Sequence, residues 1–472
     1  MRKFIIAGTI AVTLFSSTVF AGERLNLGYI YSASKSHSEI IEFTNNSVNV
    51  VSPTCFDMTP NGRLDINGMI DKEFIDDMQA KGIKVTPFLS NHWGKKRAQA
   101  ALRNPYPIIQ EVVTAVYEYN LDGVNVDLEN LDAKDKDALT NFMRLMREAM
   151  PANKTVSIAV AANPEKHTKT WIAAYDYKAL AEYVDYMVVM TYDEHCYGGA
   201  EGPVAGINFV EKSIQAVLEE VSRDKVIMGI PLYGRFWQVG KDVGGEAIVI
   251  ANVPRLIKKH KLVPKYNEFD QTPFVQLKIY EGGTSSYING RVLEPGTYNI
   301  YYENENSIRA KLDVVNKYNI LGTALWALDN EDADFWTYYK DALNETEYET
   351  EAEVKYRKKL EYAARYVVET EMPELVPKTS TKYAQKVDLK LNYKVDKALN
   401  ENPKIFIPLI EEIFILPNQK KTKAIKIKRF YIDENNELKA RETSLYYDTS
   451  YVESVSTRAL VVAWLNLPWL IL

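Results

Sequence analysis

Residues 122–129 read DGVNVDLE, and this stretch decides how the rest of the chain is interpreted. In a β-strand, side chains two residues apart point to the same face. Asn125, Asp127 and Glu129 therefore share one face, while positions 124, 126 and 128 on the other face are all aliphatic. A strictly apolar alternate face predicts a strand buried on both sides, as in a parallel sheet covered by helices.

Seven further strand-like segments accompany this one, with amphipathic stretches between them. The eight expected strands are 25–31, 48–56, 84–90, 123–129, 155–162, 186–192, 226–233 and 322–328. Between them we expect helices such as 135–150, where apolar residues recur at helical spacing. Eight βα units in about 300 residues predict an α/β fold, a (β/α)8 TIM barrel. An open doubly wound sheet is the alternative, although no Gly-rich phosphate loop follows any expected strand.

The chain is expected to contain further parts around this barrel. The stretch 236–299, between the seventh and eighth strands, is too long for an ordinary connection and predicts a small α+β insertion. We therefore expect a signal peptide at 1–21, a catalytic domain at 22–343, a charged linking helix at 344–373 and a small C-terminal accessory domain at 374–472. Within the last, 424–432 alternates as a strand does. The apolar segment 459–472 is too short to span a membrane and predicts a buried core element.

The N-terminus has the pattern of an export signal. Arg2 and Lys3 precede an apolar run, and Val19 and Ala21 occupy the two positions that a signal peptidase reads. The run is shorter than the roughly 20 residues of a membrane-spanning helix. We expect cleavage after Ala21, a bacterial protein that is secreted or associated with the cell envelope, and no stable membrane span.

Charge and cysteine content exclude several classes of function. The formal net charge of −6 leaves no electrostatic footprint for nucleic-acid binding. Cys55 and Cys196 are the only cysteines, too few for a disulfide scaffold or a four-thiolate zinc site. Cys55 ends strand two and Cys196 lies in the loop after strand six, and these two strands are on opposite sides of an eight-stranded ring. We therefore expect two free thiols, because a disulfide would need loops that fold inward.

The row of polar residues in the fourth strand predicts acid chemistry. Glu129 is its last member and should lie nearest the C-terminal mouth, where barrel enzymes have their active sites. Buried carboxyl groups this close raise each other's proton affinity, which can keep one protonated as a general acid. A hard-cation site is an alternative, but the calcium-loop pattern with its glycine is absent. A solvated sheet edge is another, and the apolar alternate face argues against it.

These residues resemble the family-18 glycoside hydrolases, whose fourth barrel strand carries Asp-Gly-x-Asp-x-Asp-x-Glu. The match is to Asp122, Gly123, Asp127 and Glu129, and the departure is Asn125, where chitinases usually have an aspartate. An asparagine there is common in the bacterial cell-wall and spore-cortex branch of the family. The resemblance therefore implies the N-acetylglucosaminidase branch rather than a true chitinase.

Further resemblances follow in the expected order. Residues 190–193 read MTYD, like the strand-six motif, and residues 229–235 read GIPLYGR, like strand seven. Trp326 resembles the strand-eight tryptophan under the sugar. Together these motifs cover roughly residues 24–343 and support the TIM barrel.

The resemblance also implies a mechanism and a set of site residues. In this family the substrate's own acetamido group is the nucleophile, so neither a metal nor a cofactor is expected. Glu129 would protonate the leaving oxygen, Asp127 would hold the acetamido N–H, and Tyr192 would orient the acetamido carbonyl. The implied substrate-binding residues are Asn125, Asp122, Met190, Asp193, Tyr233, Arg235, Trp326 and Tyr29. Trp326 would stack on the sugar. An amide at position 125 can hydrogen-bond to Asp127 but cannot ionise.

The sequence thus predicts a secreted endo-β-N-acetylglucosaminidase with an N-acetylated polysaccharide as partner. Peptidoglycan of the cell wall or spore cortex is the expected substrate, and chitinase activity is the alternative. A catalytically inactive carbohydrate-binding scaffold is an alternative of another class. It is disfavoured because the acid Glu129 is retained. Asn91, His92 and Trp93 follow strand three; they could line the cleft, or surface-loop packing could explain them.

Overall fold

The computed structural model describes residues 23–31, 35–67, 70–282, 286–289, 291–346, 348–351 and 354, and four later strands within 391–446. The chain divides into two compact units, Met1–Thr350 and Glu351–Leu472. The expected signal peptide, most of the linking helix and the apolar segment 459–472 lie outside the described residues.

The first unit is built on a ring of parallel strands. They are β1 (Leu25–Ile30), β2 (Val50–Pro53), β5 (Lys84–Val85) continued by β6 (Phe88–Ser90), β7 (Gly123–Asp127), β8 (Thr155–Ala161), β9 (Tyr186–Met190), β10 (Val226–Pro231) and β18 (Gly322–Trp326). β1 pairs with both β2 and β18. β5 pairs with β2, and β6 pairs with β7 and with β3 (Phe56–Met58), which pairs in turn with β4 (Leu64–Ile66). The two halves of the third strand thus close the ring, and the predicted (β/α)8 barrel is confirmed.

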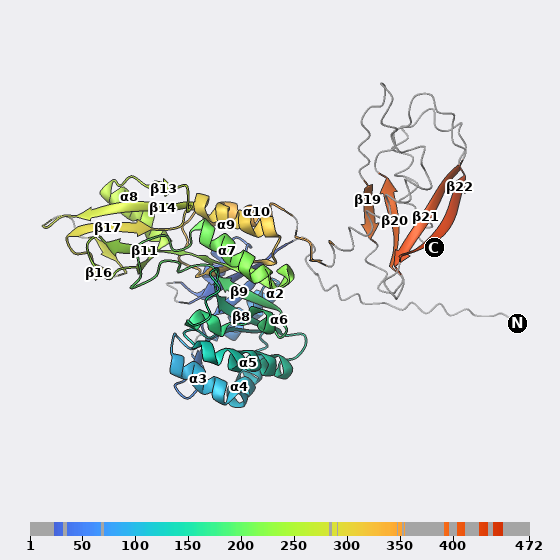
Figure 1. The fold of residues 1–472 in the computed structure, drawn as a ribbon, viewed down its shortest axis with the longest axis horizontal. Coiled ribbons are helices and arrows are strands. Elements are labelled where there is room, and N and C mark those ends of the chain that lie inside the picture. Colours follow the sequence, from blue (N-terminus) through green and yellow to red (C-terminus); the bar gives the residue numbers. More distant parts are fainter. Residues whose placement is uncertain are drawn as a thin grey trace, which may run out of the picture. The chain divides into compact units, whose positions relative to one another are not determined.

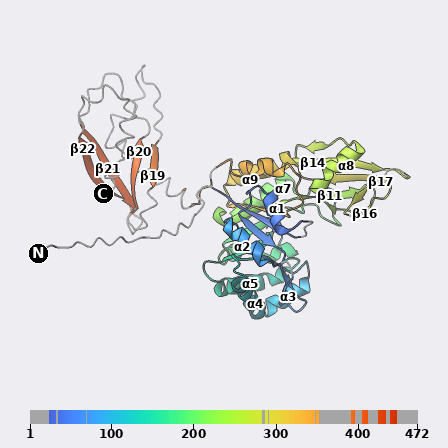
Figure 2. The ribbon, with the colours of Figure 1, turned by 180° about the vertical axis from the view of Figure 1, so that it is seen from behind.

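Helices cover the outside of the ring (Figures 1 and 2). They are α1 (His37–Phe43), α2 (Lys72–Ala80), α3 (Lys95–Arg103), α4 (Pro105–Glu118), α5 (Lys136–Ala149), α6 (Tyr177–Ala181), α7 (Ile207–Leu218), α9 (Glu305–Tyr318) and α10 (Phe335–Leu343). The helix expected at 135–150 is α5. Its buried residues are Leu139, Phe142, Met143 and Met146, the residues whose spacing predicted it.

An α+β insertion separates β10 from β18. Its five-stranded sheet has the order β12-β11-β17-β14-β13, with β11 (Tyr233–Gln238), β12 (Glu246–Val249), β13 (Lys265–Asn267), β14 (Thr272–Ile279) and β17 (Gly296–Tyr301). The sheet carries α8 (Val253–His260) and projects from the barrel as a separate lobe (Figure 1). The insertion was predicted, but it starts earlier than residue 236. The seventh barrel strand ends at Pro231, and Tyr233 opens β11 instead of closing that strand.

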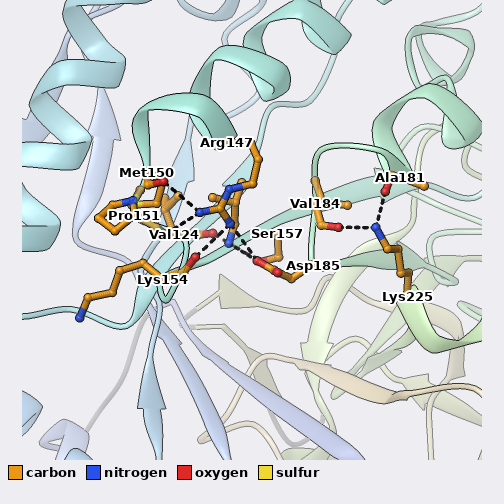
Figure 3. A network of polar contacts seen from close by, with 11 residues as sticks. Val124, Arg147, Met150, Pro151, Lys154, Ser157, Ala181, Val184, Asp185 and Lys225 are labelled. Atoms are coloured by element: carbon orange, nitrogen blue, oxygen red, sulfur yellow. Dashed lines mark hydrogen bonds and ion pairs between the residues drawn. The ribbon is translucent and has the colours of Figure 1, made fainter. Parts of the chain in front are cut away.

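Polar contacts fasten the N-terminal end of the barrel. Figure 3 shows Arg147 of α5, whose guanidinium donates hydrogen bonds to the carbonyl oxygens of Met150, Pro151 and Lys154 and contacts the Asp185 carboxylate at 3.2 Å. Nearby, Lys225 donates to two carbonyl oxygens that precede β9. These hydrogen bonds lie at the N-terminal end of the barrel, which in barrel enzymes contributes to stability. The active sites of such enzymes lie at the opposite, C-terminal end.

The second unit contains a four-stranded antiparallel sheet in the order β19-β20-β21-β22. Its strands are β19 (Leu391–Val395), β20 (Lys404–Ile410), β21 (Ala424–Ile432) and β22 (Leu438–Tyr446). The strand expected at 424–432 is confirmed as β21. Across both units, no helix in the described part of the chain has the length and apolar character needed to cross a membrane.

Candidate active site

The site is built on β7, which alternates as its sequence predicts. Val124, Val126 and Leu128 are fully buried on the side facing the helices. On the other face, Asn125 is completely buried and Asp127 nearly so, while Glu129 is half-buried just beyond the end of the strand. The row therefore runs from the barrel interior toward the C-terminal mouth, ending at Glu129.

Both carboxyl groups of this row hold protons more tightly than usual. Burial raises the pKa of Asp127 to about 7, and only the nearby charge of His92 opposes this effect. Burial also raises the pKa of Glu129 well above its usual range, and the negative charges of Asp127 and Asp193 raise it further. One carboxyl group can thus remain protonated at neutral pH beside another that is ionised, and the protonated group can then act as a general acid.

Among the described residues, the Asn125 amide bonds to Tyr29 and Ser157, and no hydrogen bond joins it to Asp127. Its Nδ2 donates to the Ser157 hydroxyl at 2.8 Å, and its Oδ1 accepts a hydrogen bond from the Tyr29 hydroxyl at 2.9 Å. Ser157 belongs to β8, which pairs with β7, whereas Tyr29 belongs to β1, which does not. Within the described residues, Oδ1 of Asp127 is buried without a hydrogen-bond partner.

Tyr192 follows β9, and its ring packs edge to face against that of Tyr233 at 6.2 Å. Burial raises the pKa of its phenol well above the usual range, and the charges of Glu129 and Asp127 are among the additional causes. The hydroxyl is therefore a hydrogen-bond donor at neutral pH. It makes no hydrogen bond within the part of the chain that the structure describes, so it is free to bind a ligand.

Asp193 links the barrel to the insertion. Its carboxylate accepts a hydrogen bond of 2.6 Å from the Tyr233 hydroxyl and two from the Arg235 guanidinium, at 2.8 and 2.9 Å. Arg235 also donates to the carbonyl oxygen of Gly245. Tyr233 and Arg235 thus reach the site from the first strand of the inserted sheet, and they form one wall together with Asp193.

Trp326 ends β18 and remains half-buried. Its ring lies against the edges of Tyr29 and Phe88, at centroid distances of 5.2 and 5.8 Å. Tyr31, which is exposed, packs against the same indole at 5.4 Å. Three aromatic rings, of Tyr29, Tyr31 and Phe88, thus pack against the indole. Met190, the last residue of β9, is almost fully buried.

Asp122 does not belong with this group, and its predicted role in substrate binding is wrong. It precedes β7, at the opposite end of the strand from Glu129, and seven residues of extended chain span about 20 Å. Its carboxylate accepts hydrogen bonds from the backbone N–H of Val85 and from the Gln79 side chain. The Asp122 side chain therefore connects the third barrel strand to the start of the fourth by a hydrogen bond.

Three residues near the row, Tyr175, Asn91 and His92, make contacts that the sequence does not predict. The Tyr175 hydroxyl donates to the Leu128 carbonyl oxygen at 2.9 Å, and Asn91 binds the backbone of Glu129. His92 lies 2.6 Å from the Asp57 carboxylate. The position of residues 91–92, directly after the third strand, was the sequence feature that could have identified Asn91 and His92. Nothing in the sequence pointed to Tyr175, which lies 46 residues after Glu129.

The prediction of two free thiols is confirmed. Cys55 is buried and Cys196 is exposed, and both thiols are free. No group of three or more His, Cys, Asp or Glu side chains in the described residues is arranged to hold a metal ion.

Comparison with known proteins agrees with this geometry. Residues 76–331, more than half of the chain, match the sequence profile described as Glycosyl hydrolases family 18. The chain is 28% identical over 353 residues to the uncharacterized glycosylase YvbX of Bacillus subtilis (strain 168), an alignment that covers 71% of this chain and 98% of that protein. It is 27% identical over 249 residues to the cortical fragment-lytic enzyme of the same organism, of which it spans about half, 53%.

Among solved structures, a chitinase from Chromobacterium violaceum ATCC 12472 shares the fold. Its TM-score is 0.60 at 24% identity, with 68% of this chain and 99% of that chain covered. At that level of identity the likeness concerns the fold alone. The profile match carries the assignment to a family. The chain belongs to family 18 of the glycosyl hydrolases, and it is a glycosidase.

Proposed function

We propose that this glycosidase hydrolyses β-linked N-acetylglucosamine polymers with retention, assisted by the substrate's own acetamido group. Peptidoglycan, of the cell wall or spore cortex, is the proposed substrate. The observation that carries this proposal is the buried pair of Asp127 and Glu129, both with raised pKa values, beside the unbonded hydroxyl of Tyr192. The half-buried indole of Trp326 adds an aromatic surface at the mouth.

In the proposed first step, Glu129 donates its proton to the glycosidic oxygen while the bond from that oxygen to the sugar C1 breaks. The acetamido carbonyl oxygen bonds to C1 in its place, giving an oxazolinium ion. In the second step water attacks C1, the bond to the acetamido oxygen breaks, and the Glu129 carboxylate takes the water's proton. The acid is thereby regenerated, and two inversions at C1 amount to retention.

Asp127 and Tyr192 would act on the acetamido group during both steps. Oδ1 of Asp127 lacks a partner in the barrel, which supports a role in accepting the acetamido N–H. Its negative charge would stabilise the positive charge that develops on the oxazolinium ring. The Tyr192 hydroxyl would donate to the acetamido carbonyl and hold it near C1. The wall formed by Asp193, Tyr233 and Arg235 would bind sugar hydroxyls.

Peptidoglycan is favoured by two observations. Asn125 replaces the aspartate that chitinases usually carry, and a cortical fragment-lytic enzyme is among the relatives. An export signal at 1–21, with cleavage after Ala21, would deliver the enzyme to such a substrate. We also propose that the catalytic domain is 22–343 and that a linking helix at 344–373 joins it to an accessory domain at 374–472.

The test is to digest purified spore cortex peptidoglycan and chitin in parallel and to identify the new reducing ends by mass spectrometry. We expect N-acetylglucosamine at the new reducing end of cortex fragments, with EDTA leaving the rate unchanged. If the protein releases sugar products from chitin but leaves the cortex peptidoglycan undigested, the enzyme is a chitinase. Loss of activity with EDTA and rescue by a divalent cation would contradict the metal-free mechanism.

A further inference from the structure

Main-chain pairing beside the fourth strand stops before it reaches Glu129. The last register pair between β6 and β7 joins Ser90 and Asp127. Beyond Ser90 the backbone of His92 and Trp93 has positive φ angles of 46° and 60°, and so turns away from the strand direction. Asn130, directly after Glu129, also has a positive φ, 58°. Glu129 therefore lies on a short irregular segment that no neighbouring strand holds through its main chain.

The side chain of Asn91 replaces the missing pairing. Its Oδ1 accepts a hydrogen bond from the backbone N–H of Glu129 at 2.9 Å, and its Nδ2 donates to the Glu129 carbonyl oxygen at 2.8 Å. A carboxamide carries the same donor and acceptor as a peptide group. The two bonds thus reproduce one rung of a sheet, made by a side chain instead of a strand. Asn91 is only 1% exposed, which protects both bonds from competition by water.

We propose that Asn91 is a positioning residue, which holds the backbone of Glu129 so that its carboxyl group stays in the geometry for proton transfer. The inference rests on the proposed acid role of Glu129. Asn91 does not touch the substrate in this proposal. Displacement of a catalytic group by about 1 Å can reduce a rate by about 100-fold, so two bonds on the acid's own peptide groups are enough to matter.

Asn49 provides a matched control at the opposite end of the barrel. Its Oδ1 accepts from the backbone N–H of Asn26 at 2.8 Å, and its Nδ2 donates to the carbonyl oxygen of Arg24 at 2.9 Å. The same side chain thus makes the same pair of backbone bonds, but at the N-terminal end of β1. Asn49→Ala removes as many hydrogen bonds as Asn91→Ala without disturbing the mouth.

The experiment measures kcat, KM and Tm for Asn91→Ala, Asn49→Ala and the wild type on a fluorogenic glycoside of di-N-acetylchitobiose. We expect Asn91→Ala to lower kcat by about 10- to 100-fold with KM within about threefold. Asn49→Ala should lower Tm by a similar amount and keep the wild-type kcat. Equal kcat values for the two variants would overturn the proposal, because Asn91 would then have only a structural role.

The pH profile gives a readout that a purely structural role would not move. Glu129 is surrounded by Asp127 and Asp193, with His92 acting on Asp127 and the hydroxyls of Tyr175 and Tyr192 nearby. In Asn91→Ala the backbone of Glu129 loses both hydrogen bonds to residue 91. We expect water to reach the Glu129 carboxyl group, so that its pKa falls. The basic limb of kcat/KM should therefore move to lower pH. An unmoved limb, with kcat reduced only as far as folded protein is lost, would also overturn the proposal.

Asn91→Asp keeps the volume of the side chain and tests the inference independently of any cavity. It replaces the donor to the Glu129 carbonyl oxygen with a negative charge, so kcat should fall while the basic limb moves to higher pH, opposite to Asn91→Ala. Glu129→Gln, measured in parallel, separates this inference from the proposed function. Full activity in Glu129→Gln would remove the acid role, whereas an inactive Glu129→Gln with unaffected Asn91 variants would refute the positioning role alone.

Discussion

The hydroxyl of Tyr29 donates a hydrogen bond of 2.9 Å to the side-chain oxygen of Asn125, and so ties the first barrel strand to the middle of the polar row on the fourth. Ser157 accepts from the other end of the same amide. The two hydrogen bonds of the Asn125 amide thus go to Tyr29 and Ser157 and not to Asp127. Within the described residues, Oδ1 of Asp127 has no hydrogen-bond partner. Burial raises the pKa of this carboxyl group, and the nearby charge of His92 lowers it.

Glu129→Gln is expected to lower turnover by about two to four orders of magnitude while sugar binding and Tm change little. The amide has almost the same shape as the protonated acid but cannot supply the proton. A matched control is Glu118→Gln, on the exposed face of α4, which should retain full activity. Wild-type turnover by Glu129→Gln would remove this residue from the acid role.

Asn125→Asp should shift the acidic limb of the kcat/KM profile to higher pH. The new carboxylate would still accept from Tyr29, but it would place a negative charge in a fully buried layer beside Asp127. A like charge raises the pKa of Asp127, which must be ionised to stabilise the intermediate. The measurement is the pH dependence of kcat/KM for the wild type and the variant on the same soluble oligosaccharide. Superimposable curves would mean that position 125 is electrostatically remote from Asp127.

Asp127→Asn is expected to abolish activity and yet increase the free energy of unfolding above neutral pH. Burial raises the pKa of Asp127 to about 7 in the folded protein, against about 4 in an unfolded chain. The folded wild type therefore binds this proton more tightly, and it loses the associated stability as pH rises from about 4 to about 7. The amide does not ionise, so the variant avoids that loss.

Urea denaturation of both proteins at about pH 4 and about pH 8 checks this expectation. The two unfolding free energies should be similar at the lower pH, and the variant should be more stable at the higher pH. A wild type that is the more stable protein at the higher pH would show that its Asp127 carboxylate is well solvated or paired in the folded state.

Lys311→Met should destabilise the fold by about 3 to 5 kcal/mol at neutral pH. Lys311 of α9 and Glu303 form an ion pair of 2.8 Å whose side chains are 1% and 0% exposed. Without its partner, Glu303 would be a buried charge with no compensation. Protonation relieves this cost, so the loss should shrink near pH 5. The double variant Lys311→Met/Glu303→Gln should recover most of the stability in urea denaturation, and equal losses for single and double variants would contradict the pairing argument.

The two thiols should differ sharply in reactivity. Cys196 is exposed, whereas Cys55 is buried and its burial raises the pKa of the thiol. Ellman's reagent should therefore titrate one thiol rapidly in the native protein and two in guanidinium chloride. A peptide joining Cys55 to Cys196 in a non-reducing mass map would contradict this prediction.

The sequence by itself determined the barrel and the inward-facing row on β7. These follow from local alternation: a strand with one strictly apolar face has a single way to be buried between a ring of strands and a layer of helices. The same reasoning located the insertion between the seventh and eighth strands, because its length exceeds that of a connection. The resemblance of the four motifs then fixed the family.

Only the tertiary structure decided what each polar side chain of the motif touches. Asp122 and Glu129 belong to one sequence motif, yet they lie at opposite ends of one strand, and only Glu129 reaches the mouth. Asn125 bonds to Tyr29, 96 residues earlier, and the backbone of Glu129 is held by Asn91, 38 residues earlier. Hydrogen bonds form between groups that folding brings within about 3 Å. Such partners leave no periodic trace in the sequence, because each depends on where several distant strands end.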